Sequence, residues 1–293
     1  MLRRSELRTD PDEREVRALL AAHLTGSDLE TARFERLPSG GLNRCWRVDS
    51  ASGPLFVRVA DTAARGLGAD WASEALLLGI ASERGIGPRP ILALPSQGLL
   101  VTEFVEGGRV AREVVSSPGC LRRIGRLLGE LHSVTPAPGI RALDFGVQAA
   151  SLESRLSASA ARPGVAARAR TVFARLRSGC DRVTPCHNDV HHANLIDDGR
   201  RLCLVDWEYG GIGDPIYDVA GFLCHHPVDE AETGLLLDAY GPGMRRERLP
   251  DACWAFDYVQ WLWYRLAVST ASDPADEAAF VARVRELAAR LET

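Results

Sequence analysis

Hydrophobic and polar residues alternate over short distances in the first third of the chain, and over helical distances in the rest. Three short apolar runs are separated by turns that contain glycine and serine, and they predict strands at 34–37, 44–48 and 55–59. Leu99–Val105 is apolar enough for a further, buried strand. Helical spacing is found at 12–24 and at 71–84, where the pattern stops before Gly85.

After Glu106-Gly107-Gly108 the pattern becomes mostly helical. The leucines and isoleucine near residue 125 share one helical face: they are Leu121, Ile124, Leu127, Leu128 and Leu131. Strands first and helices later predict an α+β fold. Because 293 residues exceed what a single core comfortably fills, we expect two lobes, at 1–105 and 106–293, with the hinge at the glycines.

Composition narrows the class of protein. A hydrophobic content of 46% with 25% charged residues is typical of a globular protein. The net charge of −4 argues against nucleic acid as a partner and is compatible with a cationic substrate. No apolar run reaches the roughly 20 residues of a membrane span, and no apolar leader follows Met1. The seven cysteines are irregularly scattered, which indicates reduced thiols. We expect a cytoplasmic protein without a membrane partner.

The polar segment 187–194 carries the chemistry that stands out. It places Asp189 five residues before Asn194, and Asp206-Trp207-Glu208 follows at the end of the apolar run 202–205. Phosphoryl transfer to a hydroxyl needs one carboxylate to orient and deprotonate the acceptor, and an Asn and an Asp to hold Mg²⁺ on the phosphates. Turn residues and a strand-end cap would be the plain alternative, but they explain none of the spacing. The segment therefore predicts a kinase.

These residues resemble the choline kinase and aminoglycoside phosphotransferase superfamily. His187, Asp189 and Asn194 match its His-x-Asp-x-x-x-x-Asn segment, and 205–209 resembles the Ile-Asp-Trp/Phe-Glu-Tyr wording of choline, ethanolamine and thiamine kinases. The resemblance implies a protein-kinase-like fold, with an N-terminal antiparallel sheet, one main helix and a mostly helical C-terminal lobe. It also implies ATP and Mg²⁺ as cofactors.

The family's motifs imply further roles. His187 would organise the catalytic loop through hydrogen bonds, and Glu208 would support a second ion or the acceptor. Asp214-Pro215-x-x-Asp218 resembles the family's Asp-Pro-x-x-Asp, whose second Asp braces the catalytic loop.

The turn between the first two predicted strands contains Ser39, Gly40, Gly41 and Asn43. Glycines allow backbone N–H groups to approach a phosphate closely, although a glycine hairpin needs no ligand. The family resemblance favours a loop that covers the nucleotide.

A kinase site also needs a cation that draws on the phosphates, paired with a glutamate of the next helix. Arg58 on the third predicted strand and Glu74 on the following helix are the candidates, with a solvated strand and helix face as the alternative. The chain contains no lysine, so arginine at this position identifies no subfamily. Backbone groups at Glu103 and Val105 would contact adenine.

An aromatic-rich helix near the C-terminus offers a substrate site. Trp254, Tyr258 and Trp261 share a helical face, and Trp263 lies beside them. Ring faces attract quaternary ammonium groups, and this segment resembles the late helix of choline kinases. A buried core helix would have the same pattern.

The sequence thus predicts an ATP- and Mg²⁺-dependent kinase for the hydroxyl of a small molecule, with choline or a similar amino alcohol as the leading substrate. Thiamine is an alternative. An aminoglycoside would need acidic side chains, for which Asp229, Glu230 and Glu232 are available. A different class is a catalytically inactive, nucleotide-binding scaffold.

Overall fold

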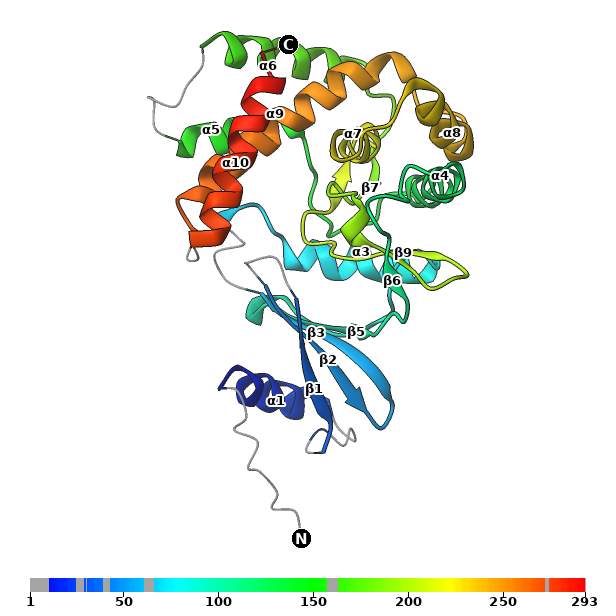
Figure 1. The fold of residues 1–293 in the computed structure, drawn as a ribbon, viewed down its shortest axis with the longest axis vertical. Helices are drawn as coiled ribbons and strands as arrows, with labels where there is room; N and C mark the ends of the chain where they lie inside the picture. Colours follow the sequence, from blue (N-terminus) through cyan, green and yellow to red (C-terminus); the bar gives the residue numbers. More distant parts are fainter. Residues whose placement is uncertain are drawn as a thin grey trace. The chain divides into compact units, whose positions relative to one another are not determined.

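The computed structural model describes residues 11–24, 29, 31–38, 43–60, 66–156, 163–271 and 274–292. Contacts divide the chain into two compact units (Figure 1), one of 1–61 with 90–104 and one of 62–89 with 105–293. The predicted lobe boundary after residue 105 lies one residue beyond Phe104, where the first unit ends. The segment 62–89, which we placed in the first lobe, makes most of its contacts in the second unit.

The first unit is a five-stranded sheet in the order β1-β2-β3-β5-β4, and every pairing in it is antiparallel. Its elements are α1 (Pro11–His23), β1 (Arg33–Leu37), β2 (Asn43–Ser50), β3 (Gly53–Ala60), β4 (Pro90–Leu94) and β5 (Leu99–Glu103). The three early strands and the strand from Leu99 are confirmed. The apolar pattern did not indicate β4, because this strand starts at a proline, carries a bulge and lies at the sheet edge, where both are tolerated.

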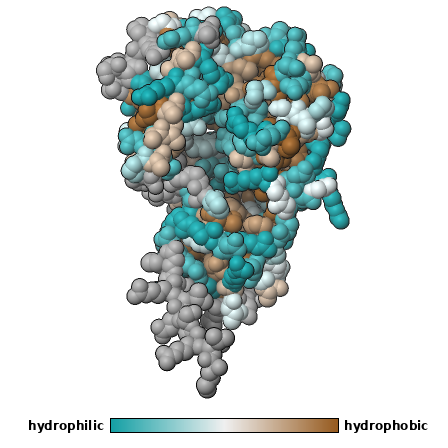
Figure 2. Space-filling model, viewed as in Figure 1, coloured by the Kyte–Doolittle hydropathy of each residue, from teal (hydrophilic) through white to brown (hydrophobic). Residues whose placement is uncertain are grey.

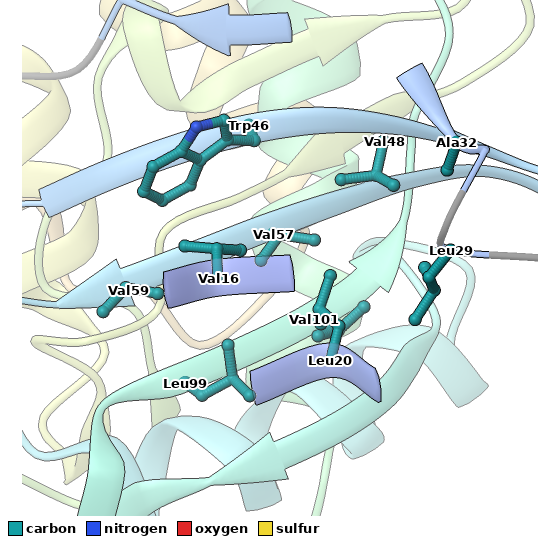
Figure 3. Packing of buried hydrophobic residues seen from close by; sticks show 10 residues of the cluster. All are labelled: Val16, Leu20, Leu29, Ala32, Trp46, Val48, Val57, Val59, Leu99 and Val101. Atoms are coloured by element: carbon teal, nitrogen blue, oxygen red, sulfur yellow. The ribbon is translucent and has the colours of Figure 1, made fainter. Parts of the chain in front are cut away.

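Helix α1 covers one face of this sheet (Figure 3). Val16 and Leu20 are fully buried against Val48, Val57 and Val101. Burial of each such side chain contributes about 1.5–3 kcal/mol. The apolar spacing that predicted a helix at 12–24 therefore marks the side that packs on the sheet.

The second unit is mostly helical (Figure 1). Its helices are α3 (Trp71–Glu83), α4 (Pro118–His132), α5 (Phe145–Arg155), α6 (Pro163–Ser178), α7 (Ile216–His225), α8 (Glu230–Tyr240), α9 (Leu249–Val268) and α10 (Pro274–Arg290). Short strands form two small sheets, β6-β8-β9 and β10-β7. These strands are β6 (Gly108–Arg109), β7 (Thr184–Cys186), β8 (Leu195–Asp197), β9 (Leu202–Leu204) and β10 (Gly211–Gly213). Except for β9, they are too short to produce a readable sequence period.

Helix α4 shows how the pattern becomes packing. Ser117 caps its N-terminus by accepting a hydrogen bond from the Cys120 N–H. All five residues of the predicted apolar face are buried. Gly125 and Gly129 lie against the backbone of α8, where a Cβ on either would overlap the carbonyl oxygen of Leu236 or of Tyr240. The two glycines therefore allow α8 to approach α4 closely.

The surface of the described residues is mixed. The face drawn in Figure 2 shows separate hydrophobic patches among hydrophilic residues. In the described ranges, the helices lack the combination of length and apolar character that crossing a bilayer requires. The seven cysteines are free thiols.

Candidate active site

Residues 187–194, which we call the catalytic loop, follow β7 and are organised by a buried histidine. His187 is fully buried; its Nδ1 accepts a hydrogen bond from the Asp189 N–H (3.2 Å) and its Nε2 donates to the Val205 carbonyl (3.0 Å). The ring of Trp207 meets it edge-on at 4.7 Å. Burial lowers the pKa of His187, so the ring remains neutral and holds the loop to the end of β9.

Asp218 of α7 binds the backbone of the same loop. Its Oδ2 accepts from the His187 N–H (2.9 Å), and its Oδ1 accepts from the Asn188 N–H (2.5 Å). Burial alone would raise the pKa of Asp218, but the hydrogen bonds from the His132 side chain and from the His187 backbone N–H hold it below its usual value. The carboxylate is therefore charged when it binds the two backbone groups.

Asp214 fixes the start of α7 and hence the position of Asp218. Its Oδ1 accepts from the Ile216 N–H (3.1 Å), and it forms a half-buried ion pair with Arg248.

Asp189 lies beside Asn194 on the loop. The Asn194 Nδ2 donates to the Asp189 carbonyl (3.0 Å) and to its Oδ2 (3.1 Å). This leaves the amide oxygen of Asn194 as the atom suited to a metal. His191 Nε2 lies 3.5 Å from Asp189 Oδ2. Burial opposes ionisation of Asp189, but the charge and hydrogen bond of His191 outweigh it and lower the pKa; Asp189 is therefore a carboxylate at neutral pH.

Residues 206–208, which we call the metal segment because they contain the predicted metal ligands, follow β9. Asp206 is exposed and adopts φ 68°, whereas Trp207 is 1% exposed and donates from Nε1 to the Leu204 carbonyl (2.9 Å). Glu208 is 4% exposed. Carboxylate oxygens and an amide oxygen are the hard ligands that Mg²⁺ prefers, so the donor set of Asp206, Glu208 and Asn194 fits this ion.

Arg141 is a residue of this site that sequence reasoning missed. Its guanidinium donates to three backbone carbonyls, those of Gly68 (2.6 Å), Gly210 (2.9 Å) and Glu208 (3.4 Å). Burial lowers its pKa. Through these hydrogen bonds, Arg141 connects the metal segment to the chain that leads into α3. The irregular segment before it gave no motif that could have revealed this.

Three of the four predicted substrate aromatics pack inside the helical unit. Trp254 donates to the Leu291 carbonyl (3.4 Å), Tyr258 donates to Glu153 of α5 (2.5 Å), and the guanidinium of Arg265 covers the ring of Trp261 at 4.4 Å. The structure does not bring these three rings to Asp189. Their role in substrate binding stays a prediction, and their packing is that of the core alternative.

Trp263 lies elsewhere. Its ring meets Tyr209 edge-on at 6.3 Å and Tyr264 at 5.0 Å, and its Nε1 donates to the Leu67 carbonyl (2.9 Å). Burial raises the pKa of Tyr209 and of Tyr264, and the negative charge of Asp189 raises each further. Tyr209, Trp263 and Tyr264 therefore form an aromatic group, and the Tyr209 carbonyl accepts a hydrogen bond from the side chain of Asn188, the residue before Asp189. Position 209, directly after the metal segment, was the signal for the tyrosine that we missed.

The residues expected on the nucleotide side are divided between the two units. Asn43 begins β2 opposite Ala60, and Arg58 (3% exposed) lies in β3. Glu103 ends β5 in the same unit.

Glu74 (2% exposed, in α3) and Val105 belong to the second unit. The Arg58–Glu74 ion pair therefore stays a prediction. Ser39, Gly40 and Gly41 lie outside the described residues.

The model of the APH family, described as the phosphotransferase enzyme family, matches residues 33–250. The chain belongs to this family. The match contains every residue of the catalytic loop and of the metal segment, so both lie in a phosphotransferase domain.

The chain is also similar to individual proteins, some of which carry the names of kinases. The chain is 36% identical over 56 residues to Protein LicA of Haemophilus influenzae, and 38% identical over 64 residues to the thiamine kinase of Salmonella heidelberg. These matches span about a fifth of this chain (19% and 22%) and of each relative (21% and 22%). A choline/ethanolamine kinase family protein of Mesorhizobium loti has the same fold, with a TM-score of 0.78, 25% identity, and 96% and 95% of the two chains covered. The predicted α+β, protein-kinase-like fold and the identification as an enzyme of the phosphotransferase family are thereby confirmed.

Proposed function

We propose that this phosphotransferase moves the γ-phosphate of ATP, with Mg²⁺, to the hydroxyl of choline or a similar amino alcohol. One observation carries the proposal. The carboxylate of Asp189, the amide of Asn194 and the carboxylates of Asp206 and Glu208 lie on two loops that one buried residue, His187, joins by hydrogen bonds.

Asp189 orients the acceptor hydroxyl and takes its proton as the oxygen attacks phosphorus. Asn194 Nδ2 holds one oxygen of this carboxylate, so the second oxygen is the one that faces the acceptor. Asn194 Oδ1 and Asp206 would hold Mg²⁺, with Glu208 in support. The ion, when bound, neutralises charge on the phosphates.

The nucleotide would be held by the first unit. Arg58 would draw on the phosphates, whereas its pairing with Glu74 and a phosphate-covering role for Ser39, Gly40, Gly41 and Asn43 stay predictions from the sequence. Backbone groups at 103–105 contact adenine.

The acceptor would bind at Tyr209, Trp263 and Tyr264. A trimethylammonium group cannot donate a hydrogen bond, so it is recognised by ring faces and by negative charge, and a desolvated cation–π contact is worth on the order of 2 kcal/mol. The relatives named choline/ethanolamine kinase and thiamine kinase favour a cationic alcohol. Thiamine is the second candidate on the same grounds.

An aminoglycoside is less well supported. Asp229 and Glu232 form the capping box of α8, and Glu230 is paired with Arg246. These carboxylates have structural partners, so they are not an open acidic cluster for a polycation. An inactive scaffold is disfavoured because Asp189, Asn194 and Asp206 are all present.

A panel assay tests the proposal. ADP release is measured with ATP, Mg²⁺ and choline, ethanolamine, thiamine, homoserine or kanamycin in turn. Choline or ethanolamine should give the largest kcat/KM. A larger kcat/KM for thiamine would identify the protein as a thiamine kinase instead. Folded protein that binds ATP but turns over none of these acceptors would favour a catalytically inactive scaffold.

A further inference from the structure

A chain of buried hydrogen bonds leads from α8 to the catalytic loop. Asp218 Oδ2 lies 2.9 Å from His132 Nε2, His132 Nδ1 lies 3.0 Å from the hydroxyl of Tyr240, and Arg182 donates to that hydroxyl (3.3 Å). Both Asp218 and His132 are essentially inaccessible, at 0% and 1% exposure. Asp218 in turn accepts the His187 and Asn188 N–H groups.

The direction of each bond follows from chemistry. A carboxylate only accepts, so the His132 nitrogen that faces Asp218 carries the proton. In a neutral imidazole, which the proposal below requires, the other nitrogen is an acceptor and the Tyr240 hydroxyl is its donor. Arg182 only donates, so it satisfies the phenol oxygen. Burial raises the pKa of Tyr240 to about 12, although Arg182 opposes this, and the phenol therefore keeps the proton that it donates.

The packing that places Tyr240 is specific. Gly125, Gly129 and His132 lie at i, i+4 and i+7 of α4, which puts them on one face. The two glycines admit the backbone of α8 up to Tyr240 itself. Any side chain at either glycine would push the phenol away from the imidazole.

The same place offers a group of potential metal ligands, and the hydrogen bonds argue against that use. His132, Cys186 and Asp218 present ligand atoms within 4.8 Å of one another. However, Asp218 already accepts three hydrogen bonds, and burial raises the pKa of the Cys186 thiol well above its usual value. The cluster is a hydrogen-bonded support.

We propose that Tyr240 is a positioning residue for phosphoryl transfer: its hydroxyl donates to Nδ1 of the neutral His132 ring, whose Nε2–H group holds Asp218 and thereby the backbone of the catalytic loop. The effect on turnover rests on the proposed kinase function. The effect on the loop does not.

The first experiment observes the loop without any substrate. Hydrogen exchange of the segment 184–190 is compared in wild type, Tyr240→Phe and Tyr217→Phe. Tyr217 is a buried tyrosine one residue from Asp218, and no hydrogen bond of its hydroxyl is found among the described residues. Loss of one net hydrogen bond of about 1–1.5 kcal/mol should speed loop exchange by about five- to tenfold in Tyr240→Phe only.

Nitrogen-15 spectra of histidine-labelled protein report the tautomer. Wild-type His132, assigned with His132→Gln, should be neutral and protonated at Nε2. Tyr240→Phe should remove the hydrogen-bond shift at Nδ1, and Tyr217→Phe should not. An imidazolium, or a proton on Nδ1 in wild type, would overturn the proposal.

Two further variants keep the proposal testable if Tyr240→Phe folds poorly. Arg182→Met at the exposed end of the chain should speed loop exchange by about twofold, an effect that disappears in the Tyr240→Phe background. Gly125→Ala displaces α8 without removing any atom of the chain and should act like Tyr240→Phe. Its control is Gly234→Ala in α8, where a Cβ meets nothing within 4 Å.

Turnover completes the test. With an accepted substrate, Tyr240→Phe should lower kcat about five- to tenfold with an unchanged KM for ATP, because the loop and not the nucleotide site is affected. Unchanged loop exchange and kcat in folded Tyr240→Phe would refute the proposal, as would equal losses in Tyr217→Phe. Absence of turnover in wild type would count against the proposed function alone, since the exchange and the spectra would still report on Tyr240.

Discussion

Replacing Asp189 by asparagine is the sharpest test of the chemistry. The change keeps the size of the side chain and its amide oxygen can still accept from Asn194 Nδ2, which lies 3.1 Å from the present Oδ2. The bond from Asn194 to the backbone carbonyl of residue 189 (3.0 Å) does not involve the side chain. The change does remove the attraction between the carboxylate and His191, which lies 3.5 Å away and lowers the pKa of Asp189. We therefore expect the free energy of unfolding to fall by about 1–3 kcal/mol, the usual worth of a hydrogen bond to a charged group, which leaves the variant folded.

The effect on catalysis should be much larger. The oxygen that faces the acceptor becomes an NH₂ group, which cannot take a proton. A positioned general base is worth about 10²–10⁴ in rate, which corresponds to about 2.7–5.4 kcal/mol in the activation free energy. The expected result is a kcat lower by that factor with nearly unchanged affinity for ATP.

The assay is ADP release at saturating ATP with the best acceptor of the panel, together with urea denaturation of each variant. Asp198→Asn is the matched control: it makes the same change on the same unit, at an exposed carboxylate that accepts from the backbone N–H groups of Arg200 and Arg201 and lies 3.5 Å from the Arg201 guanidinium. A kcat of folded Asp189→Asn within threefold of wild type would refute the assignment. An equal loss in Asp198→Asn would show that the effect is not specific to the site.

Four other variants have defined outcomes. Asp206→Ala should shift the Mg²⁺ dependence of activity to higher concentration, because the ion loses its exposed carboxylate; superimposable Mg²⁺ titrations would make Asp206 structural. Trp263→Ala should raise KM for a cationic acceptor by roughly thirtyfold with an unchanged KM for ATP, whereas Trp261→Ala should mainly lower Tm. Burial lowers the pKa of His226 to about 4, below the unfolded value of about 6.5, so the unfolded state binds more protons between these values. Stability should therefore be lost as pH falls from about 6.5 to about 4, by at most about 3 kcal/mol, and urea titrations of His226→Gln should show a flatter pH dependence.

The sequence predicted those parts of the site whose chemistry is local. Asp189, Asn194 and Asp206 are defined by residue type and spacing, and the strand before Asp206 has a readable apolar run. The burial of α4 followed from helical period alone, since five apolar residues on one face need a partner surface.

The parts that escaped prediction depend on which element meets which. The helical period of the sequence shows that Trp254, Tyr258 and Trp261 share a face of α9. The ring centroids of Trp254 and Tyr258 lie 5.5 Å apart, and those of Tyr258 and Trp261 lie 6.0 Å apart. The period cannot show that this face meets α5 and the C-terminal residues instead of the catalytic loop. Arg141 was missed for the same reason, because its partners are backbone carbonyls far away in the chain, which have no sequence signature.

Two residues of the site have a left-handed backbone conformation, which their residue types allow but do not predict. Among the described residues other than glycine, φ is positive at Asn188 and Asp206, one in each loop of the site. Asn and Asp tolerate this conformation, which costs free energy at most other residues. At Asn188 it directs two successive N–H groups to the single carboxylate of Asp218, an arrangement that resembles a backbone nest for anions. The Asn188 side chain then donates to the Tyr209 carbonyl (3.2 Å), which joins this loop to the metal segment. The conformation of Asn188 is thus held by the buried carboxylate of Asp218 on one side and by the chain at Tyr209 on the other, so that this residue joins the two loops.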